Sequence, residues 1–258
     1  DAPLACAQSV RNSITMTFDE GYAEELKIFL KLLDSDQSRA QRHLFFAERE
    51  AGKVAGVTKD VKPRAVKKAG VIGAGTMGGG IAMSLVNGGI PVTILEMAQE
   101  PLDKGLERIR NNYGISVKRG SMTAADVDKR MALFTPTTSY DDLADCDIII
   151  EAATENVELK KKIFAQLSAV ASPTAILASN TSSISITAIA AQTSRPHRVI
   201  GMHFMNPVPI MKLVEIIRGL ATSDETYATV NAVAEQMGKT TVLGRDMPGF
   251  IVNRVLMP

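Results

Sequence analysis

The spacing of apolar side chains changes partway along the chain. Up to about residue 50, apolar residues recur at intervals of three and four positions, which is the repeat of an amphipathic helix. The repeat is clearest at Leu26, Phe29, Leu30 and Leu33. From residue 66 onward, short continuous apolar runs alternate with helical patterns, and the polar, lysine-rich residues 51–65 lie between the two parts. We therefore expect a helical segment, a linker and a second domain.

The second part of the chain has the pattern of alternating strands and helices. Its apolar runs are short and continuous, which is typical of strands buried on both faces of a parallel sheet. We predict strands at 69–72, 91–95, 147–150, 175–178, 198–204, 212–217 and 240–243. We predict helices at 77–86, 101–119, 157–170 and 225–237, and a last helix opened by Pro248-Gly249-Phe250. The expected fold is α/β, a Rossmann-type doubly wound and mostly parallel sheet preceded by a helical segment.

A glycine loop follows the first predicted strand and opens the first helix of this domain. Its sequence is Gly73-Ala74-Gly75-Thr76-Met77-Gly78. In dinucleotide-binding domains the first glycine permits a tight turn, the second lets the backbone approach a pyrophosphate, and the third lets the helix pack against the strand. The free N–H groups at the start of the helix then face the phosphates. The sequence therefore predicts a dinucleotide site at this loop.

The second predicted strand ends at Glu96, about 20 residues beyond the loop. A carboxylate at this place accepts hydrogen bonds from the hydroxyls of an adenine ribose. The residues that follow, Met97-Ala98-Gln99, offer no cation for a 2′-phosphate. The sequence therefore favours NAD over NADP. The alternative is a surface glutamate beside an ordinary glycine turn.

Composition narrows the classes of function. The net charge is +1, so nothing favours a nucleic acid or an acidic membrane surface as a partner. No apolar run approaches the roughly 18 residues that span a bilayer. Cys6 and Cys146 lie far apart in sequence, so we expect a reducing compartment and no disulfide. Cys146 has no base close to it in sequence, so we expect it to be structural, and we assign no metal ligands.

Of the three histidines, one stands apart. His43 belongs to the helical segment and His197 to a polar loop, whereas His203 ends an apolar strand, where open α/β sheets bind their ligands. Two prolines after His203 force a turn, so 212–217 can return as an antiparallel strand with Glu215 beside His203. A carboxylate there fixes the tautomer of the imidazole and stabilises its cation. The alternative is a core histidine with an unrelated edge-strand glutamate.

Short polar side chains follow two further strands. The run Ser179-Asn180-Thr181-Ser182-Ser183 comes after the strand at 175–178, and Glu155-Asn156 comes after the strand at 147–150. Because the carboxyl ends of parallel strands meet at one edge of a sheet, these side chains can line the crevice that holds His203. Helix capping explains the same residue types, so both interpretations stay open.

Together these segments resemble the 3-hydroxyacyl-CoA dehydrogenase family. The resemblance covers residues 66 to 258 and depends on several long motifs in the same order. The motifs are the glycine loop 73–78, Ala178-Ser179-Asn180-Thr181-Ser182-Ser183, Met202-His203-Phe204-Met205-Asn206-Pro207-Val208-Pro209, Met211-Lys212-Leu213-Val214-Glu215 and Pro248-Gly249-Phe250-Ile251-Val252-Asn253-Arg254. The resemblance implies NAD-dependent oxidation of an L-3-hydroxyacyl-CoA to a 3-ketoacyl-CoA in fatty-acid β-oxidation.

The resemblance also implies roles for particular residues. His203 would be the general base and Glu215 its orienting partner, while Ser182 and Asn253 would contact the reacting oxygen of the substrate. The residues implied to bind NAD are Gly73, Gly75, Thr76, Met77, Gly78, Glu96, Ala153, Thr154, Glu155, Lys160, Ser182 and Asn206. The last four of these would lie along the nicotinamide half of the cofactor.

The two ends of the chain resemble other parts of multifunctional fatty-acid oxidation enzymes. Residues 13–19 and 40–49 are similar to the tail of a hydratase domain. We expect 1–50 to be that crotonase-like tail, 51–65 a linker, 66–247 the NAD-binding dehydrogenase domain, and 248–258 the start of a C-terminal helical domain. Both ends look cut, so we expect a fragment without hydratase activity, whose turnover depends on contacts with the missing hydratase and C-terminal domains.

Two rivals to this function stay open. A 3-hydroxyacid dehydrogenase would act on a free acid and use a lysine, whereas this sequence offers His203 with Glu215. A non-catalytic structural relative would keep only the nucleotide fold. The resemblance also places Lys118 and Arg119 where members of the family meet the CoA phosphates. For location, we expect the bacterial cytoplasm, or a peroxisome in a eukaryote.

Overall fold

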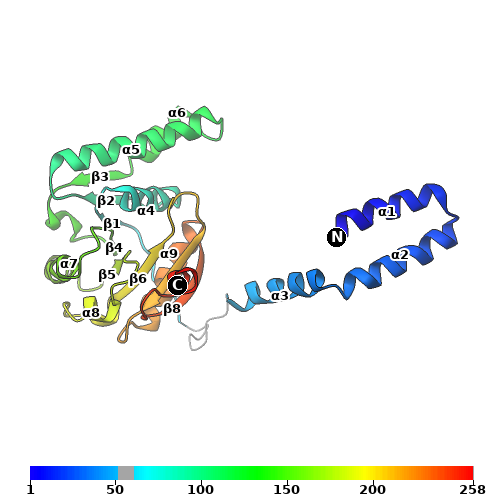
Figure 1. Ribbon diagram of the computed structural model, residues 1–258. Helices are drawn as coiled ribbons and strands as arrows, with labels where there is room; N and C mark the ends of the chain where they lie inside the picture. The colour runs from blue at the N-terminus through cyan, green and yellow to red at the C-terminus, as the bar shows by residue number, and fades with distance from the viewer. Residues whose placement is uncertain (52–60, 258) are drawn as a thin grey trace. The chain divides into compact units, whose positions relative to one another are not determined.

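A computed structural model describes residues 1–51 and 61–257 of the chain. The chain divides into two compact units, residues 1–55 and 56–258. The smaller unit is helical and the larger unit holds the sheet, as the change in apolar spacing predicts (Figure 1). Of the predicted linker, residues 52–60 lie outside the described residues.

The described residues of the N-terminal unit, 1–51, form helices α1 (Ala2–Thr15), α2 (Phe18–Leu33) and α3 (Asp36–Ala51). A capping box starts α2, in which the Thr17 hydroxyl accepts a hydrogen bond from the Glu20 N–H and the Glu20 carboxylate accepts one from the Thr17 N–H. Among residues 1–51 only Asn12 is buried. The apolar side chains that set the helical repeat are exposed.

In the described part of the chain, the larger unit is built on an eight-stranded sheet with the order β3-β2-β1-β4-β5-β6-β7-β8. Neighbouring strands pair in parallel, except that β6 and β7 are antiparallel. The strands are β1 (Ala69–Ile72), β2 (Val92–Leu95), β3 (Phe134–Thr137), β4 (Ile148–Glu151), β5 (Ile176–Ser179), β6 (Val199–Phe204), β7 (Leu213–Arg218) and β8 (Thr240–Arg245).

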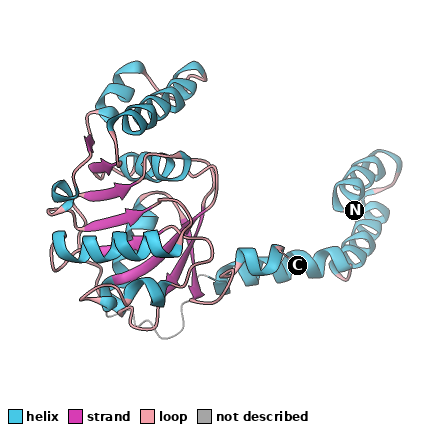
Figure 2. Cartoon of the chain, turned by 60° about the vertical axis from the view of Figure 1, so that its left-hand side comes forward, coloured by secondary structure: helices cyan, strands magenta, loops and turns pink. Residues whose placement is uncertain are grey.

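Helices lie on both sides of the strands (Figure 2). Every residue of β1, β2, β4 and β5 is buried, as their continuous apolar runs predict. One buried cluster joins the sheet to two helices through Phe164, Leu177 and Ile189. In the described residues of this unit the α-helices are α4 (Thr76–Asn87), α5 (Gln99–Lys118), α6 (Ala124–Met131), α7 (Val157–Val170), α8 (Ile186–Ala190), α9 (Asp224–Gln236) and α10 (Val252–Leu256).

Among the α-helices and strands of the described residues, the apolar spacing does not predict β3, α6 and α8. β3 lies at the edge of the sheet, contains Pro136 and has two exposed residues, so it has no continuous apolar run. α6 and α8 have 8 and 5 residues, which is too short to show a clear helical period. The last helix also begins later than expected, because Pro248-Gly249-Phe250 form a turn and α10 starts at Val252.

The strand order reverses between β1 and β4. From β1 the chain continues outward through β2 and β3, then crosses to β4 on the other side of β1 and continues through β5 and β6. Loops that leave neighbouring strands in opposite directions open a crevice at the carboxyl ends of those strands. The glycine loop follows β1 and residues 152–156 follow β4, so both lie at this crevice.

Candidate active site

The glycine loop between β1 and α4 allows a ligand to approach closely. Gly73 has a φ of +97°, a conformation that other residues rarely adopt. A Cβ on Gly78 would lie 1.8 Å from the Gly73 carbonyl oxygen, so only glycine lets α4 pack here. A Cβ on Gly75 would meet nothing within 4 Å. The open space at Gly75, next to the start of α4, fits the pyrophosphate of a dinucleotide.

Glu96 follows β2 and reaches back to the glycine loop. Its Oε1 accepts a 2.7 Å hydrogen bond from the Ala74 backbone N–H, and its Oε2 accepts one from the Met97 N–H at 3.2 Å. The carboxylate therefore holds the loop in place. Its contact with the ribose hydroxyls stays a prediction.

Two crevices lie along the carboxyl ends of the strands. The first, of about 480 Å³, is lined by residues that include Gly73, Gly75, Glu96, Ala153 and Thr154. The second, of about 380 Å³, is lined by residues that include Met77, Ala153, Glu155, Ser182, His203, Asn206 and Asn253. The two crevices share Ala152 and Ala153, just after β4. Adjoining crevices at the point where the strand order reverses suit the two halves of a dinucleotide.

His203 and Glu215 are register partners across the antiparallel pair of β6 and β7. His203 Nδ1 and Glu215 Oε2 lie 2.6 Å apart, and both side chains are buried. The antiparallel return expected after the two prolines is therefore confirmed, and with it the contact between histidine and glutamate. Because a carboxylate only accepts hydrogen bonds, Nδ1 carries a proton and Nε2 is left to accept another.

The second oxygen of Glu215 binds the start of α10. Oε1 accepts hydrogen bonds from the backbone N–H groups of Ile251 at 2.8 Å and Val252 at 2.9 Å. Burial raises the pKa of Glu215, but the hydrogen bonds from His203, Val252 and Ile251 outweigh burial, so the pKa lies below its ordinary value. The carboxylate is therefore charged at neutral pH and able to stabilise an imidazolium.

Glu155 holds the polar loop that follows β5. Its Oε1 accepts hydrogen bonds from the Thr181 hydroxyl at 2.6 Å and from the Ser182 N–H and hydroxyl at 2.9 and 3.1 Å. Burial raises the pKa of Glu155, but these hydrogen bonds outweigh it and lower the pKa. Helix capping is present as well, because the Asn156 side chain accepts a hydrogen bond from the Leu159 N–H at the start of α7. Both interpretations of these polar residues hold.

Asn180, Asn206 and Asn253 line the second crevice. The Asn253 side chain, in α10, donates a 3.4 Å hydrogen bond to the Ser182 carbonyl oxygen. Asn206 follows β6 and lines the crevice. The Asn180 side chain accepts a hydrogen bond from the Phe204 N–H at 3.0 Å, which joins the end of β5 to the end of β6.

The sequence patterns did not select Glu151, a buried carboxylate beside the site. Glu151 is the last residue of β4, has no exposed surface, and lies 2.6 Å from the ammonium of Lys160, which is itself 1% exposed. A glutamate in an apolar run is the signal that selects Glu215, and the same signal would have selected Glu151. Thr76, the first residue of α4, is exposed at the glycine loop.

Lys118 and Arg119 are exposed at the end of α5 and lie outside the lining of both crevices. Their contact with CoA phosphates stays a prediction. Within residues 1–51 and 61–257, no group of three or more His, Cys, Asp or Glu side chains is placed to hold a metal ion. No helix in these two ranges is both long enough and apolar enough to cross a membrane.

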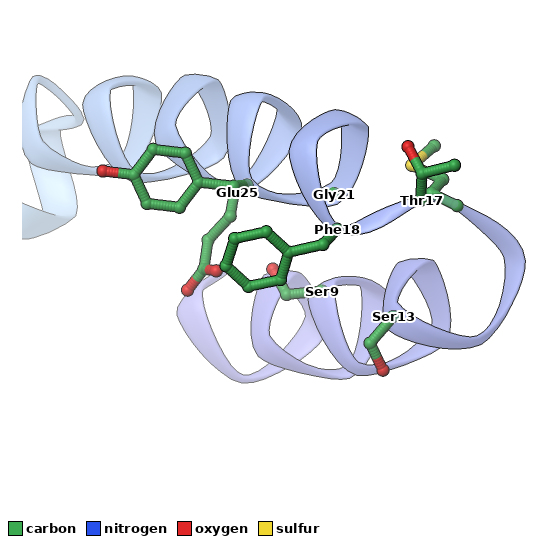
Figure 3. Close-up of a pocket in the computed structure, with 8 residues that line it drawn as sticks. Ser9, Ser13, Thr17, Phe18, Gly21 and Glu25 are labelled. Carbon is green, nitrogen blue, oxygen red and sulfur yellow. The ribbon is translucent and has the colours of Figure 1, made fainter.

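The N-terminal unit has hollows of its own. One hollow, of about 270 Å³, lies between α1 and α2 and is lined by residues that include Ser9, Ser13, Thr17, Phe18 and Glu25 (Figure 3). The rings of Phe18 and Tyr22 stack there with centroids 6.4 Å apart. None of the residues selected from the sequence for catalysis or cofactor binding lines this hollow, so it is no part of the candidate active site.

Known proteins resemble this chain in sequence and in fold. Residues 68–247 match the family described as 3-hydroxyacyl-CoA dehydrogenase, NAD binding domain. The chain is 49% identical over 191 residues to a probable 3-hydroxybutyryl-CoA dehydrogenase of Deinococcus radiodurans, covering 74% of this chain and 68% of that protein. It is 39% identical over 261 residues to a peroxisomal bifunctional enzyme of Danio rerio, covering 100% of this chain and 36% of that protein.

A solved structure shows the same likeness. The (S)-3-hydroxybutyryl-CoA dehydrogenase PaaH1 from Ralstonia eutropha is 47% identical to this chain, with a TM-score of 0.73 over 74% of this chain and 68% of that one. The chain thus spans about two thirds of such relatives, and 36% of relatives such as the Danio rerio enzyme. With the fold and the two crevices described above, these matches show that the chain belongs to the 3-hydroxyacyl-CoA dehydrogenase family, with an NAD-binding domain at residues 68–247.

Proposed function

We propose that this chain takes part in the NAD-dependent oxidation of an L-3-hydroxyacyl-CoA to a 3-ketoacyl-CoA in fatty-acid β-oxidation. The observation that carries this proposal is the His203–Glu215 pair, 2.6 Å apart, with His203 in the wall of the second crevice. The pair supplies a base together with its orienting carboxylate. The names of the relatives, which include 3-hydroxybutyryl-CoA dehydrogenases, support an acyl-CoA as the substrate.

In this reaction His203 removes the proton of the substrate 3-hydroxyl group through Nε2. Glu215 engages Nδ1, so proton transfer leaves an imidazolium that the carboxylate stabilises. The hydrogen on C3 leaves with its electron pair for NAD, which supplies the hydride acceptor when bound, and C3–O becomes a carbonyl. Ser182 and Asn253, joined by a 3.4 Å hydrogen bond, hold the substrate oxygen beside His203.

The two crevices divide the binding of the cofactor and substrate between them. The residues proposed for the pyrophosphate are Gly73, Gly75, Thr76, Met77 and Gly78. Glu96 binds the adenine ribose, and it favours NAD because a 2′-phosphate would meet its negative charge. The residues proposed to lie toward the nicotinamide half are Ala153, Thr154, Glu155, Lys160, Ser182 and Asn206. Lys118 and Arg119 are proposed to meet the CoA phosphates.

The test of this function replaces His203 with glutamine in the full-length protein. Loss of the base is expected to lower the rate of 3-ketoacyl-CoA formation by about 10²–10⁴-fold while NAD still binds. His197→Gln is the matched control, because His197 is exposed and lies outside the lining of the second crevice. A wild-type rate in His203→Gln would contradict the assignment. Faster turnover of a free 3-hydroxyacid than of its CoA thioester would contradict the substrate class.

The same proposal extends to the organisation of the protein. Multifunctional relatives align with the whole of this chain, whereas the 3-hydroxybutyryl-CoA dehydrogenases align with 74–75% of it. This pattern supports residues 1–50 as the tail of a hydratase domain, 51–65 as a linker, 66–247 as the dehydrogenase domain, and 248–258 as the start of a C-terminal helical domain. The partners are then the acyl-CoA and the adjoining domains of a multifunctional fatty-acid oxidation enzyme.

The location that we propose is a reducing compartment, either the bacterial cytoplasm or a peroxisome in a eukaryote. Both cysteines, Cys6 and Cys146, are free. The relatives come from bacteria such as Colwellia psychrerythraea and include the peroxisomal enzyme of Danio rerio.

A further inference from the structure

Glu151 is a buried carboxylate to which the mechanism gives no role. Its Oε1 accepts a hydrogen bond from the Lys160 ammonium at 2.6 Å and one from the Ala153 N–H at 2.8 Å. Its Oε2 accepts one from the Ser179 hydroxyl at 2.6 Å. Glu151 therefore joins α7, the loop after β4 and the end of β5, beside the two residues that both crevices share.

Lys160 extends these contacts toward the second crevice. Besides its bond with Glu151, the ammonium lies 3.4 Å from the Ala153 carbonyl oxygen and 3.5 Å from Glu155 Oε2. Glu155 in turn accepts hydrogen bonds from the N–H and hydroxyl of Ser182. A continuous chain of polar contacts thus runs from the interior of the sheet to a residue that lines the crevice.

The energetics of the Glu151–Lys160 pair favour a role other than stability. Burying two charges costs free energy because both lose their contact with water, and their mutual attraction inside the protein barely offsets this cost. A protein with two apolar side chains of similar size in place of the ion pair is therefore often equally stable. The pair does supply position. Lys160 cannot move away without leaving a carboxylate unpaired inside the sheet, and the same carboxylate holds the Ala153 N–H.

We propose that Glu151 is a positioning residue for the cofactor. Through Lys160 and Ala153 it fixes the loop after β4, and through Lys160 and Glu155 it fixes the loop that carries Ser182. Glu151 lines neither crevice, so it acts on binding only through these neighbours. The inference depends on the proposed function for one point, that the nicotinamide half of NAD occupies the second crevice.

The test compares the binding of NADH with that of ADP-ribose, which lacks only the nicotinamide ring. Glu151→Gln keeps the size of the side chain and removes the charge that holds Lys160. We expect this variant of the 258-residue chain to bind NADH on the order of tenfold or more weakly, and ADP-ribose within about twofold of wild type. A merely structural role would weaken both ligands together, because the glycine loop and Glu96 belong to the same sheet.

Two further variants accompany Glu151→Gln. Lys160→Met should also weaken NADH and not ADP-ribose, because Lys160 is the residue through which Glu151 acts and is itself proposed to lie toward the nicotinamide half. Lys161→Gln is the matched control on α7. Lys161 forms an ion pair with the exposed Glu158 at 2.9 Å and is not part of the polar contacts that connect Glu151, Lys160, Glu155 and Ser182. Both affinities should stay unchanged in Lys161→Gln.

The double variant Glu151→Gln/Lys160→Met distinguishes an effect on the position of the cofactor loops from an effect on the stability of the fold. It removes both buried charges together, so it should unfold at a temperature no lower than either single variant, yet still bind NADH weakly. Wild-type NADH affinity in the double variant would overturn the proposal, and so would an equal loss of NADH and ADP-ribose affinity in the single variants. If Glu151→Gln does not fold, Glu151→Asp decides, because it keeps both buried charges and shortens only the side chain that holds Lys160. It should weaken NADH and not ADP-ribose, and unchanged NADH affinity would overturn the proposal.

Binding is measured here without substrate, so this inference and the proposed oxidation can fail separately. A fully active His203→Gln variant would remove the proposed function and leave the difference between NADH and ADP-ribose in place. Unchanged NADH affinity in Glu151→Gln would contradict the positioning role of Glu151 without affecting the proposal that His203 is the base.

Discussion

Two glycines of the cofactor loop are needed for different reasons. Gly78 is required by packing, because a Cβ there would lie 1.8 Å from the carbonyl oxygen of Gly73. Gly75 has a φ of −66°, which any residue adopts, and a Cβ there would meet nothing within 4 Å. The fold therefore tolerates a larger residue at position 75, and the glycine there is explained by the approach of a ligand.

Alanine at each position should separate these two effects. Gly75→Ala should keep the wild-type unfolding temperature and bind NAD at least about tenfold more weakly, because the methyl group occupies the approach to the pyrophosphate. Gly78→Ala should lower the free energy of unfolding by about 1–3 kcal/mol or more, through overpacking. Thermal unfolding with and without NAD measures both. Equal destabilisation of the two variants would contradict this explanation.

Glu215 couples the stability of the domain to pH. Burial raises its pKa, but the hydrogen bonds from His203, Val252 and Ile251 outweigh burial and keep the pKa below the ordinary value of 4.5. A carboxylate whose pKa is lower in the folded state stabilises the fold fully above the unfolded-state pKa. That contribution disappears as the pH falls through the folded-state pKa.

Glu215→Gln should therefore be less stable than the wild type at neutral pH, and the difference should shrink as the pH falls below 4.5. Denaturant unfolding between about pH 7 and about pH 3 gives the free energy of both proteins at each pH. Glu158→Gln is the control, because the Glu158 side chain is 74% exposed. A difference in stability that stays constant across this range would show that Glu215 acts without its charge.

The site residues that the sequence reveals are those that interrupt a pattern. His203 and Glu215 stand within apolar strands, so their pairing was predictable from two prolines and an antiparallel return. Glu151 is the last residue of its strand and lies just beyond the predicted strand at 147–150, so it was passed over although apolar residues flank it. Asp246 gives no signal at all, although it accepts hydrogen bonds from Ser185 and from the Ile186 N–H, about 60 residues away. Only the folded chain brings those groups together.

At the scale of elements, the predicted bounds are right where the buried side chains of a helix or strand form a regular apolar pattern in the sequence. The helix at Val157–Val170 and the strand at Ala69–Ile72 have the expected bounds, because each buries a continuous or periodic apolar set. The edge strand Phe134–Thr137 buries only its two end residues, and its pairing with β2 depends on backbone hydrogen bonds that any sequence supplies. The position of such a strand is determined by the strand with which it pairs, so its own residues do not reveal it.

One loop of the second crevice is held by a buried cation. Lys239, between α9 and β8, donates hydrogen bonds to the carbonyl oxygens of Val208 and Met211. Burial lowers the pKa of Lys239. The loop held in this way carries Asn206 to the crevice, so an element far along the chain shapes this part of the site.

Lys239→Met should loosen this loop, because it leaves two carbonyl oxygens without their donor. We expect a loss of about 1–3 kcal/mol in the free energy of unfolding and faster proteolytic cleavage between residues 205 and 212. Lys212→Met is the control, since Lys212 is exposed next to the same loop. Cleavage at the wild-type rate in Lys239→Met would show that the loop is held by its own packing.

At the scale of the molecule, the two units differ in what stabilises them. The larger unit buries whole strands, whereas among residues 1–51 only Asn12 is buried. The change in apolar spacing predicted this division of the chain. It could not predict the difference in burial, because an amphipathic repeat shows where the apolar face lies but not whether anything covers it.

Hydrogen exchange should reveal this difference directly. Helix α2 contains good helix formers and a capping box, but its apolar face is exposed, as at Phe18 and Phe29. Helix α4 contains three consecutive glycines, which disfavour helix, but Ile81 and Leu85 are fully buried. Because helices gain most of their stability from packing, α4 should exchange its amide hydrogens orders of magnitude more slowly than α2 in this chain. Equal protection of α2 and α4 would mean that the exposed apolar side chains of residues 1–51 pack against something in solution.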